Sequence, residues 1–292
     1  MKPIEIYVDG AGVRGPGGWG VLIIYPDGKR KKLSGSENNT TNNRMELTAP
    51  IMAIKQFPDG TVLKIYSDSE YVVKGITKWI YYWIRNGLLF TKEGRVPGSP
   101  EPEVELKNKD LWIELLRESK RCKIDWEWVP GHSGIEGNEI ADQLAVDAMA
   151  VLRSELAKSL RDELIASIYG ENKTLTISDT AFFQPGGPFK SLVSSIEDSK
   201  IEYTIKIEGP PDRSPKISIY LNTEKDKQYK KKIVDKLIAF TNERKYLIQA
   251  VNIDKKAKSF WKDLGFNPKG GSPKARTYIF NEQLEQIPEP NA

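Results

Sequence analysis

Alternating apolar and polar positions at the start of the chain predict three strands joined as a meander. These strands are predicted at residues 3–8, 19–25 and 29–35, with Gly/Pro turn signals at 15–18 and 26–28 between them. A helical period then runs from about residue 42 to 57, and we expect Asn42 or Asn43 to cap this helix. Further along, the pattern predicts strands at 62–67 and 123–129 and helices at 69–76, 78–86, 108–119 and from near Gly137. This order predicts an α/β fold in which helices flank a mixed five-stranded sheet.

The second half of the chain has a pattern typical of a separate, smaller α/β or α+β domain. Leucine recurs at every fourth position from 152 to 164, so the helix that begins near Gly137 is expected to continue to about Ile168. Beyond it, strands are predicted at 173–178, 201–208, 216–221, 246–251 and 275–280, and helices at 226–241 and 255–263. We therefore expect one domain over residues 1–150 and an accessory domain over residues 151–292 that starts with a linking helix.

Composition excludes several kinds of site. Cys122 is the only cysteine and His132 the only histidine, so an internal disulfide, a cysteine-rich zinc site and a histidine cluster are ruled out. No apolar run is long enough to span a bilayer and the first residues lack a signal-peptide pattern, so we expect a cytoplasmic protein that does not bind membranes. Residues 1–150 carry 20 Lys+Arg and 21 Asp+Glu, a net charge of −1. Residues 151–292 carry 24 Lys+Arg and 19 Asp+Glu, a net charge of +5, and the two halves together give the net charge of +4 of the chain. The mildly basic second half is compatible with nucleic-acid contact.

Four acidic residues lie where predicted strands end or predicted helices begin. Asp9 and Asp68 follow the first and fourth strands, Glu46 lies one turn into the first helix, and Asp142 lies near the start of the last helix. In an open twisted sheet such positions meet at one edge. A cluster of carboxylates is the hard-oxygen donor set that two divalent ions need for phosphodiester hydrolysis. Each acid alone is better explained as a helix cap or a solvated charge, but the four together favour a metal site.

Six segments of the first half, in order and with similar spacing, resemble type 1 ribonuclease H of the bacterial form. They are Tyr7–Gly10, Gly15–Gly20, Thr40–Leu47, Ser67–Val72, Trp126–Gly134 and Asn138–Ala145, and the resemblance covers about residues 3–148. It implies a ribonuclease H-like fold and hydrolysis of the RNA strand of RNA–DNA hybrids, which gives 5′-phosphate and 3′-hydroxyl ends. It also implies two Mg²⁺ ions as cofactors, with Mn²⁺ as an alternative. The partner is then the RNA–DNA hybrid, and we expect a monomer without a protein partner.

The resemblance also implies a role for each matching residue. Asp9 would bridge the two ions, and His132, in a glycine-flanked loop, would assist proton transfer or product release. The implied metal ligands are Asp9, Glu46, Asp68 and Asp142. The implied substrate contacts are Gly10, Thr41, Asn42, Asn43, Glu70 and Trp79. Alternatives stay open for three of these positions: helix capping for the two asparagines, a core position for Trp79, and an ordinary surface histidine at 132.

Some positions depart from the bacterial pattern. The loop after Asp9 is shorter, Glu70 stands where glutamine is common, and residues 84–105 are longer and less basic than the protrusion that grips the hybrid. Since phosphate contacts supply much of the affinity for nucleic acid, we expect weak binding by the first half alone. Two alternatives to an active ribonuclease H are a nucleic-acid-binding protein with this fold as scaffold and another nuclease of the same superfold.

The accessory domain has a limited resemblance of its own. Residues 246–280 resemble the C-terminal part of Gcn5-related acetyltransferases, but residues 224–230 lack the glycine that a pyrophosphate-binding loop needs, which argues against that activity. The predicted helix at 226–241 is rich in lysine, and these side chains either form a phosphate-binding face or an ordinary solvated surface. The lysines on or near it are Lys225, Lys227, Lys230, Lys231, Lys232 and Lys236. We expect this domain to add grip on nucleic acid.

Overall fold

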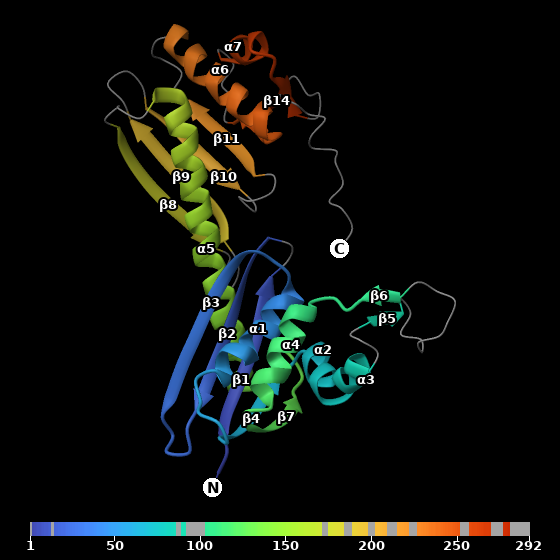
Figure 1. Cartoon of the computed structure of the whole chain (residues 1–292). Coiled ribbons are helices and arrows are strands. Elements are labelled where there is room, and N and C mark those ends of the chain that lie inside the picture. Colours follow the sequence, from blue (N-terminus) through green and yellow to red (C-terminus); the bar gives the residue numbers. More distant parts are fainter. Residues whose placement is uncertain are drawn as a thin grey trace. The chain divides into compact units, whose positions relative to one another are not determined.

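The protein divides into two compact units, Met1–Leu152 and Arg153–Ala292, shown in Figure 1. The computed structural model describes residues 2–12, 15–85, 89–91, 103–170, 175–183, 189–197, 202–208, 215–221, 227–251, 257–269 and 277–280. Within these described ranges, no helix combines the length and the apolar character needed to cross a membrane.

The first unit is built on a five-stranded sheet with the order β3-β2-β1-β4-β7. Strands β1 (Ile4–Gly12), β2 (Gly15–Ile24) and β3 (Arg30–Thr40) form the antiparallel meander. Strands β4 (Val62–Ser67) and β7 (Lys123–Trp128) extend the sheet parallel to β1. The prediction of a mixed five-stranded sheet flanked by helices is therefore confirmed. The strands are longer than predicted. Strand β1 continues beyond Asp9 to Gly12, because this stretch is still paired with β2. Strand β2 begins at Gly15, within the predicted turn, and β3 extends to Thr40.

Helices α1 (Asn42–Ile54) and α4 (Lys109–Ser119) bury their apolar sides against one face of this sheet. Ile6, Val8 and Ile65 from the sheet pack there with Leu47 of α1 and Trp112 of α4, and all five side chains are fully buried. Burial of each such side chain contributes roughly 1.5–3 kcal/mol. This core holds the start of α1 against the end of β1, which is where two of the predicted ligands lie.

The helix boundaries correct two predictions. Thr41 caps α1, because its hydroxyl accepts the N–H of Arg44, so neither Asn42 nor Asn43 is the cap. The two helices predicted at 69–76 and 78–86 are one continuous run, made of α2 (Glu70–Lys74), a π-helical turn η1 (Gly75–Trp79) and α3 (Ile80–Arg85). A Cβ at Gly75 would lie 2.1 Å from the ring of Trp112, so glycine lets this run pack directly on α4.

A short antiparallel pair, β5 (Leu89–Thr91) and β6 (Glu103–Glu105), follows α3 and was not among the predicted strands. The predicted protrusion at 84–105 lies largely outside the described residues.

Helix α5 (Glu136–Tyr169) packs closely on strand β2 through glycine. A Cβ at Gly18 or Gly20 would lie 2.1 Å from the carbonyl oxygen of Ala145 or Ala141, so the helix can lie against bare backbone there. The boundary between the two units falls within this helix, after Leu152.

The second unit contains a seven-stranded sheet with the order β13-β14-β12-β11-β10-β9-β8. Strands β8 (Thr176–Phe183), β9 (Phe189–Glu197), β10 (Glu202–Glu208) and β11 (Lys216–Leu221) are antiparallel. Helix α6 (Lys227–Arg244) then leads to β12 (Leu247–Ala250), which is parallel to β11. Helix α7 (Lys258–Asp263) and strands β13 (Asn267–Pro268) and β14 (Tyr278–Phe280) complete the unit.

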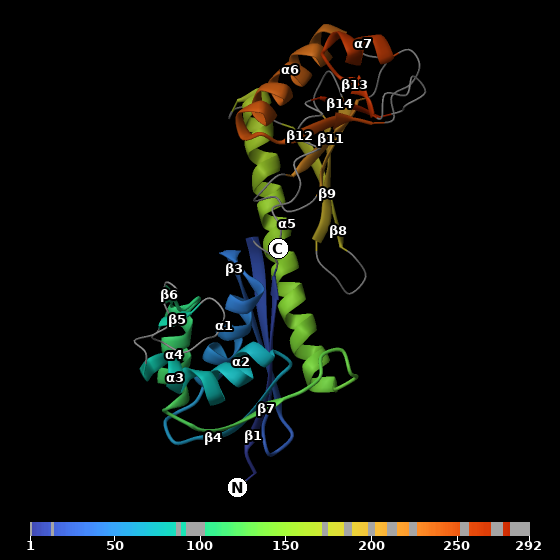
Figure 2. The ribbon, with the colours of Figure 1, turned by 90° about the vertical axis from the view of Figure 1, so that its right-hand side faces the viewer.

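The core of the second unit lies between its sheet and helices α5 and α6, both visible beside the sheet in Figure 2. Leu164 of α5 and Leu237 of α6 pack with Ile205 of β10. Strand β9 was not predicted, because serines at 191, 194 and 195 weaken its apolar pattern. Its buried face alternates Leu192, Ser194 and Ile196, so a polar residue interrupts the apolar positions. A second α/β unit is nevertheless present, as predicted.

Candidate functional site

Asp9 and Glu46 come together because β1 and α1 touch at a glycine. A Cβ at Gly10 would lie 2.2 Å from the backbone nitrogen of Glu46, so only glycine permits this approach. Asp9 is 8% exposed, and its Oδ1 accepts the N–H of Gly10 at 2.7 Å. The first predicted ligand is therefore a buried carboxylate with one backbone donor.

Glu46 is held by two side chains from different elements. Its Oε1 accepts a hydrogen bond from Asn42 Nδ2 at 2.8 Å, and its Oε2 accepts one from Ser69 Oγ at 2.6 Å. Ser69 is also the N-cap of α2, where its hydroxyl accepts the N–H of Val72. Through Ser69, Glu46 is linked to the turn that carries Asp68.

Asp68 and Asp142 come to the same region from β4 and α5. The parallel register pairs Val8 with Ser67, so Asp9 and Asp68 follow at the same edge of the sheet. Asp68 Oδ2 accepts a hydrogen bond from Asn138 Nδ2 at 3.0 Å, and its carbonyl oxygen accepts one from Trp128 Nε1 at 2.9 Å. Asp142 lies one turn after Asn138 on α5.

The four carboxylates are close enough for their negative charges to act on one another. Burial raises the pKa of Asp9 to about 8, with further increases from the negative charges of Asp68, Asp142 and Glu46. Burial likewise raises the pKa of Glu46 and of Asp142, although His132 beside Asp142 works in the opposite direction. Such a cluster is under repulsion unless a cation or protons neutralise it.

The donor chemistry fits divalent metal ions. Four carboxylates and no competing thiol form the hard-oxygen set that Mg²⁺ prefers. In their described rotamers, however, no three acidic, histidine or cysteine side chains converge as ligands of one ion, within the part of the chain that the structure describes. Both oxygens of Glu46 and one of Asp68 are engaged in the hydrogen bonds above. Each of these oxygens keeps a second lone pair, so Glu46 can ligate an ion while it accepts these hydrogen bonds.

His132 lies in the loop between β7 and α5. Its backbone is left-handed (φ 50°) and its side chain is exposed. Burial raises the pKa of Asp142, and the nearby His132 opposes this rise. The loop is tied to α5, because the N–H of Gly134 donates to Glu139 Oε1 at 3.3 Å. The structure thus places the single histidine beside the carboxylate cluster.

The predicted substrate contacts lie around this cluster. Thr41 and Asn43 are exposed at the start of α1, while the Asn42 amide is engaged by Glu46. Glu70, at the start of α2, forms an ion pair with Lys74 at 2.7 Å.

Trp79 is 39% exposed and packs on Trp83, with ring centroids 5.9 Å apart. It is therefore not a core residue, and it presents a supported aromatic surface.

Sequence reasoning missed two polar residues of this site, Ser69 and Asn138. Both lie within segments that resemble ribonuclease H, but no role was predicted for either. The available signal was that each is a small polar residue within four positions of a predicted ligand.

The predicted basic face of the second unit is smaller than expected. Lys230 is 4% exposed and Lys236 donates to the carbonyl of Ile168, which leaves Lys231 and Lys232 as exposed lysines of α6. The helical period buries Lys230 on the same side as apolar residues of α6. Lys225 and the side chain of Lys227 lie outside the described residues.

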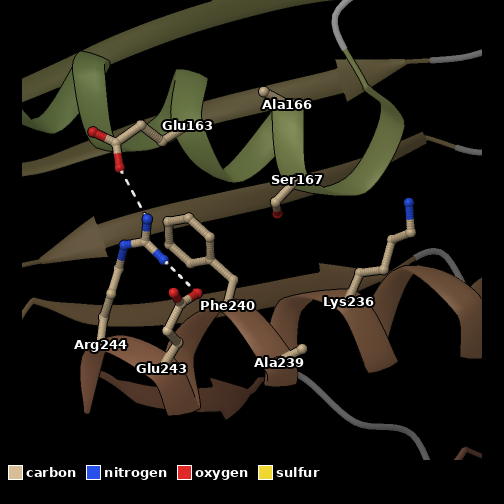
Figure 3. A pocket seen from close by; sticks show the side chains of 8 residues that line it. All are labelled: Glu163, Ala166, Ser167, Lys236, Ala239, Phe240, Glu243 and Arg244. Carbon is tan, nitrogen blue, oxygen red and sulfur yellow. Dashed lines mark hydrogen bonds and ion pairs between the residues drawn. The ribbon is translucent and has the colours of Figure 1, made fainter.

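A pocket of about 450 Å³ lies between α5 and α6 within the second unit (Figure 3). The Arg244 guanidinium lies 4.0 Å from the ring centre of Phe240 and pairs with Glu163 at 3.4 Å and Glu243 at 3.2 Å. These charged groups are thus engaged with one another. The lining residues are Glu163, Ala166, Ser167, Lys236, Ala239, Phe240, Glu243 and Arg244.

Comparisons with known proteins concern the first half of the chain. Residues 1–150 match the model of the family described as RNase H. A ribonuclease H of Chromohalobacter salexigens is 42% identical over 165 residues, which is 56% of this chain and 94% of that protein. One of Hahella chejuensis is 47% identical over 148 residues, 50% of this chain and 92% of that protein. A crystal structure of a type 1 RNase H with the type 2 active-site motif has 31% sequence identity and a TM-score of 0.40. The matched region is 51% of this chain and 74% of the chain in that structure.

Proposed function

The chain belongs to the RNase H family and is a ribonuclease H, and from this we propose that it cleaves the RNA strand of RNA–DNA hybrids with two divalent metal ions. The ions, Mg²⁺ with Mn²⁺ as an alternative, would be held by Asp9, Glu46, Asp68 and Asp142. The observation that carries this proposal is the cluster around Asp9, whose pKa is raised first by burial and further by the charges of the three other carboxylates. A cation is the natural partner for a cluster of negative charges.

When bound, the two ions would activate the attacking water and stabilise the charge on the transferred phosphoryl group. Asp9, placed by the Gly10 contact with α1, is proposed as the ligand that bridges them. Ser69 and Asn42 set the direction of the Glu46 carboxylate. His132, beside Asp142 on a glycine-flanked loop, is proposed to move a proton at the leaving group or to assist product release. The products would be a 5′-phosphate and a 3′-hydroxyl.

Substrate recognition is proposed to use the surface around the cluster. A ribonuclease that prefers a hybrid must sense the 2′-hydroxyl across the shallow minor groove. Gly10, Asn42 and Asn43 would do so with backbone amides, while the exposed Thr41 contacts a DNA phosphate. Trp79, supported by Trp83, is proposed to lie along a DNA sugar. The Lys74 partner neutralises Glu70, so this acidic position is less unfavourable near phosphate than its charge alone suggests.

A cleavage assay tests the proposed function. The full chain is incubated with labelled RNA–DNA hybrid, double-stranded RNA and double-stranded DNA, with Mg²⁺, Mn²⁺ or EDTA. We expect cleavage of the hybrid alone, only with metal, and none by Asp68→Asn. Sequencing of the product ends checks for 5′-phosphate. Absence of hybrid cleavage by the wild type under every metal condition refutes the proposal.

We also propose that the second unit adds affinity for the hybrid through the exposed Lys231 and Lys232. Each phosphate contact contributes about −0.9 to the slope of log K against log salt concentration. Lys231→Glu/Lys232→Glu is therefore expected to weaken binding and make this slope less steep by roughly 2. Lys158→Glu/Lys262→Glu, two exposed lysines of the same unit, is the matched control. Equal slopes for both variants and the wild type contradict this role, and light scattering of the same samples tests the expected monomer.

A further inference from the structure

Asn138 is a buried polar residue whose side chain has one hydrogen-bond partner among the described residues. Its side chain is 2% exposed, and its Nδ2 donates to Asp68 Oδ2 at 3.0 Å. Its Oδ1 is buried without a hydrogen-bond partner among the residues that the structure describes. Burial of an unsatisfied amide oxygen is unfavourable for stability. Stability therefore does not explain an asparagine at this position, whereas its hydrogen bond to Asp68 does.

The same oxygen of Asp68 also contacts the loop that carries His132. A Cβ at Gly131 would lie 2.8 Å from Asp68 Oδ2, so this oxygen lies against the backbone of the loop. The next residue of α5, Glu139, accepts the N–H of Gly134 from the other side of that loop. Two consecutive residues of α5 thus hold a predicted ligand and the predicted histidine loop in one arrangement.

The first turn of α5 is itself fixed on the sheet. Gly137 lies flat on Tyr7, since a Cβ there would be 2.4 Å from two ring carbons. Tyr7 stacks in turn on Tyr66, with centroids 4.5 Å apart and an angle of 10° between the rings. Tyr66 lies two residues before Asp68 on β4. The stack therefore connects the strand that bears Asp68 directly to the helix turn that bears Asn138.

From these contacts we propose that Asn138 is a positioning residue for the metal site, an inference that rests on the proposed function. By holding Oδ2, it directs the other carboxylate oxygen of Asp68 towards the ions. It also sets the distance between Asp68 and the His132 loop, which packs against the same oxygen. Residues that hold metal ligands in this way typically change metal affinity or activity by 10- to 100-fold when they are removed.

The test compares Mg²⁺ binding to full-length Asn138→Leu and Asn138→Ala with the wild type by isothermal calorimetry. Leucine has nearly the shape of asparagine and removes the unsatisfied oxygen, so Asn138→Leu is expected to fold even if the alanine variant does not. We expect the Kd for Mg²⁺ to rise about 10- to 100-fold. The Mg²⁺ concentration for half-maximal cleavage should rise in parallel, with partial recovery of kcat at saturating Mg²⁺. Gln143→Ala, which removes an exposed amide bonded to Asp147 on the same helix, should change neither value.

Folded Asn138→Leu with wild-type Mg²⁺ affinity overturns the inference. The binding measurement does not depend on turnover, so it separates the two proposals. A wild type that binds Mg²⁺ but does not cleave hybrid refutes the proposed function alone. A wild type that cleaves hybrid while Asn138→Leu keeps its Mg²⁺ affinity refutes the positioning role alone.

Discussion

Removal of one carboxylate from the cluster is expected to stabilise the metal-free protein. Asp9→Asn abolishes the charge of the most deeply buried of the four carboxylates, which is 8% exposed. Its pKa of about 8 lies well above its ordinary value of 3.8. At 1.36 kcal/mol per pH unit, the raised pKa of Asp9 lowers the free energy of unfolding by ~4 kcal/mol at pH 7 and by ~6 kcal/mol at pH 9. Because the asparagine amide must also be buried, we expect a measured gain of roughly 2–4 kcal/mol at pH 7.

The pH dependence follows from the sign of this shift. A raised carboxyl pKa means that the folded state holds the proton more tightly than the unfolded state. The contribution of Asp9 is therefore most favourable below pH 3.8, and stability is lost as pH rises from there to about 8. Asp9→Asn lacks this loss, so the difference between the two proteins should grow across that window.

Urea unfolding in EDTA, followed by circular dichroism at pH 5, 7 and 9, measures this difference. Asp125→Asn, which changes an acid that is 72% exposed, is the control and should stay close to the wild type. Addition of Mg²⁺ should stabilise the wild type more than Asp9→Asn. A wild type that is as stable as Asp9→Asn in EDTA at pH 9 would refute the electrostatic argument.

Three further changes test other contacts of the site. Ser69→Ala removes both a hydrogen-bond donor to Glu46 and the cap of α2, so the free energy of unfolding should fall by about 1 kcal/mol and Mg²⁺ binding should weaken. Ser69→Thr should restore both, and urea unfolding and calorimetry measure the two effects. Gly10→Ala places a Cβ 2.2 Å from the nitrogen of Glu46, which should cost roughly 1–3 kcal/mol of stability and most of the activity; a fully active variant would contradict the close approach. His132→Ala should slow cleavage by about 10²- to 10⁴-fold in single-turnover assays without a change in Mg²⁺ affinity, and weaker Mg²⁺ binding would argue for a ligand role instead.

Local features of the sequence were enough to predict the frame of the first unit and its candidate chemistry. The meander, the mixed sheet and the helix that bears Glu46 follow from apolar periods and turn residues that act over a few positions. The four acids were selected because they follow strands or begin helices, and their motifs carried the resemblance to ribonuclease H. In the second unit the same method missed β9, since its serines give little apolar contrast.

Tertiary structure decided how those acids are held and which neighbours matter. Ser69 reaches Glu46 across 23 positions of the chain, and Asn138 reaches Asp68 across 70. Gly10 is required by the backbone of α1, and Lys230 of the predicted basic face is buried in the second unit. Periodicity describes which side of an element is apolar, but only the packing of elements determines which side chains from distant positions meet. For this reason the sequence alone determined the fold of the first unit and the candidate ligands, while the hydrogen bonds and close contacts that orient them came from the packed structure.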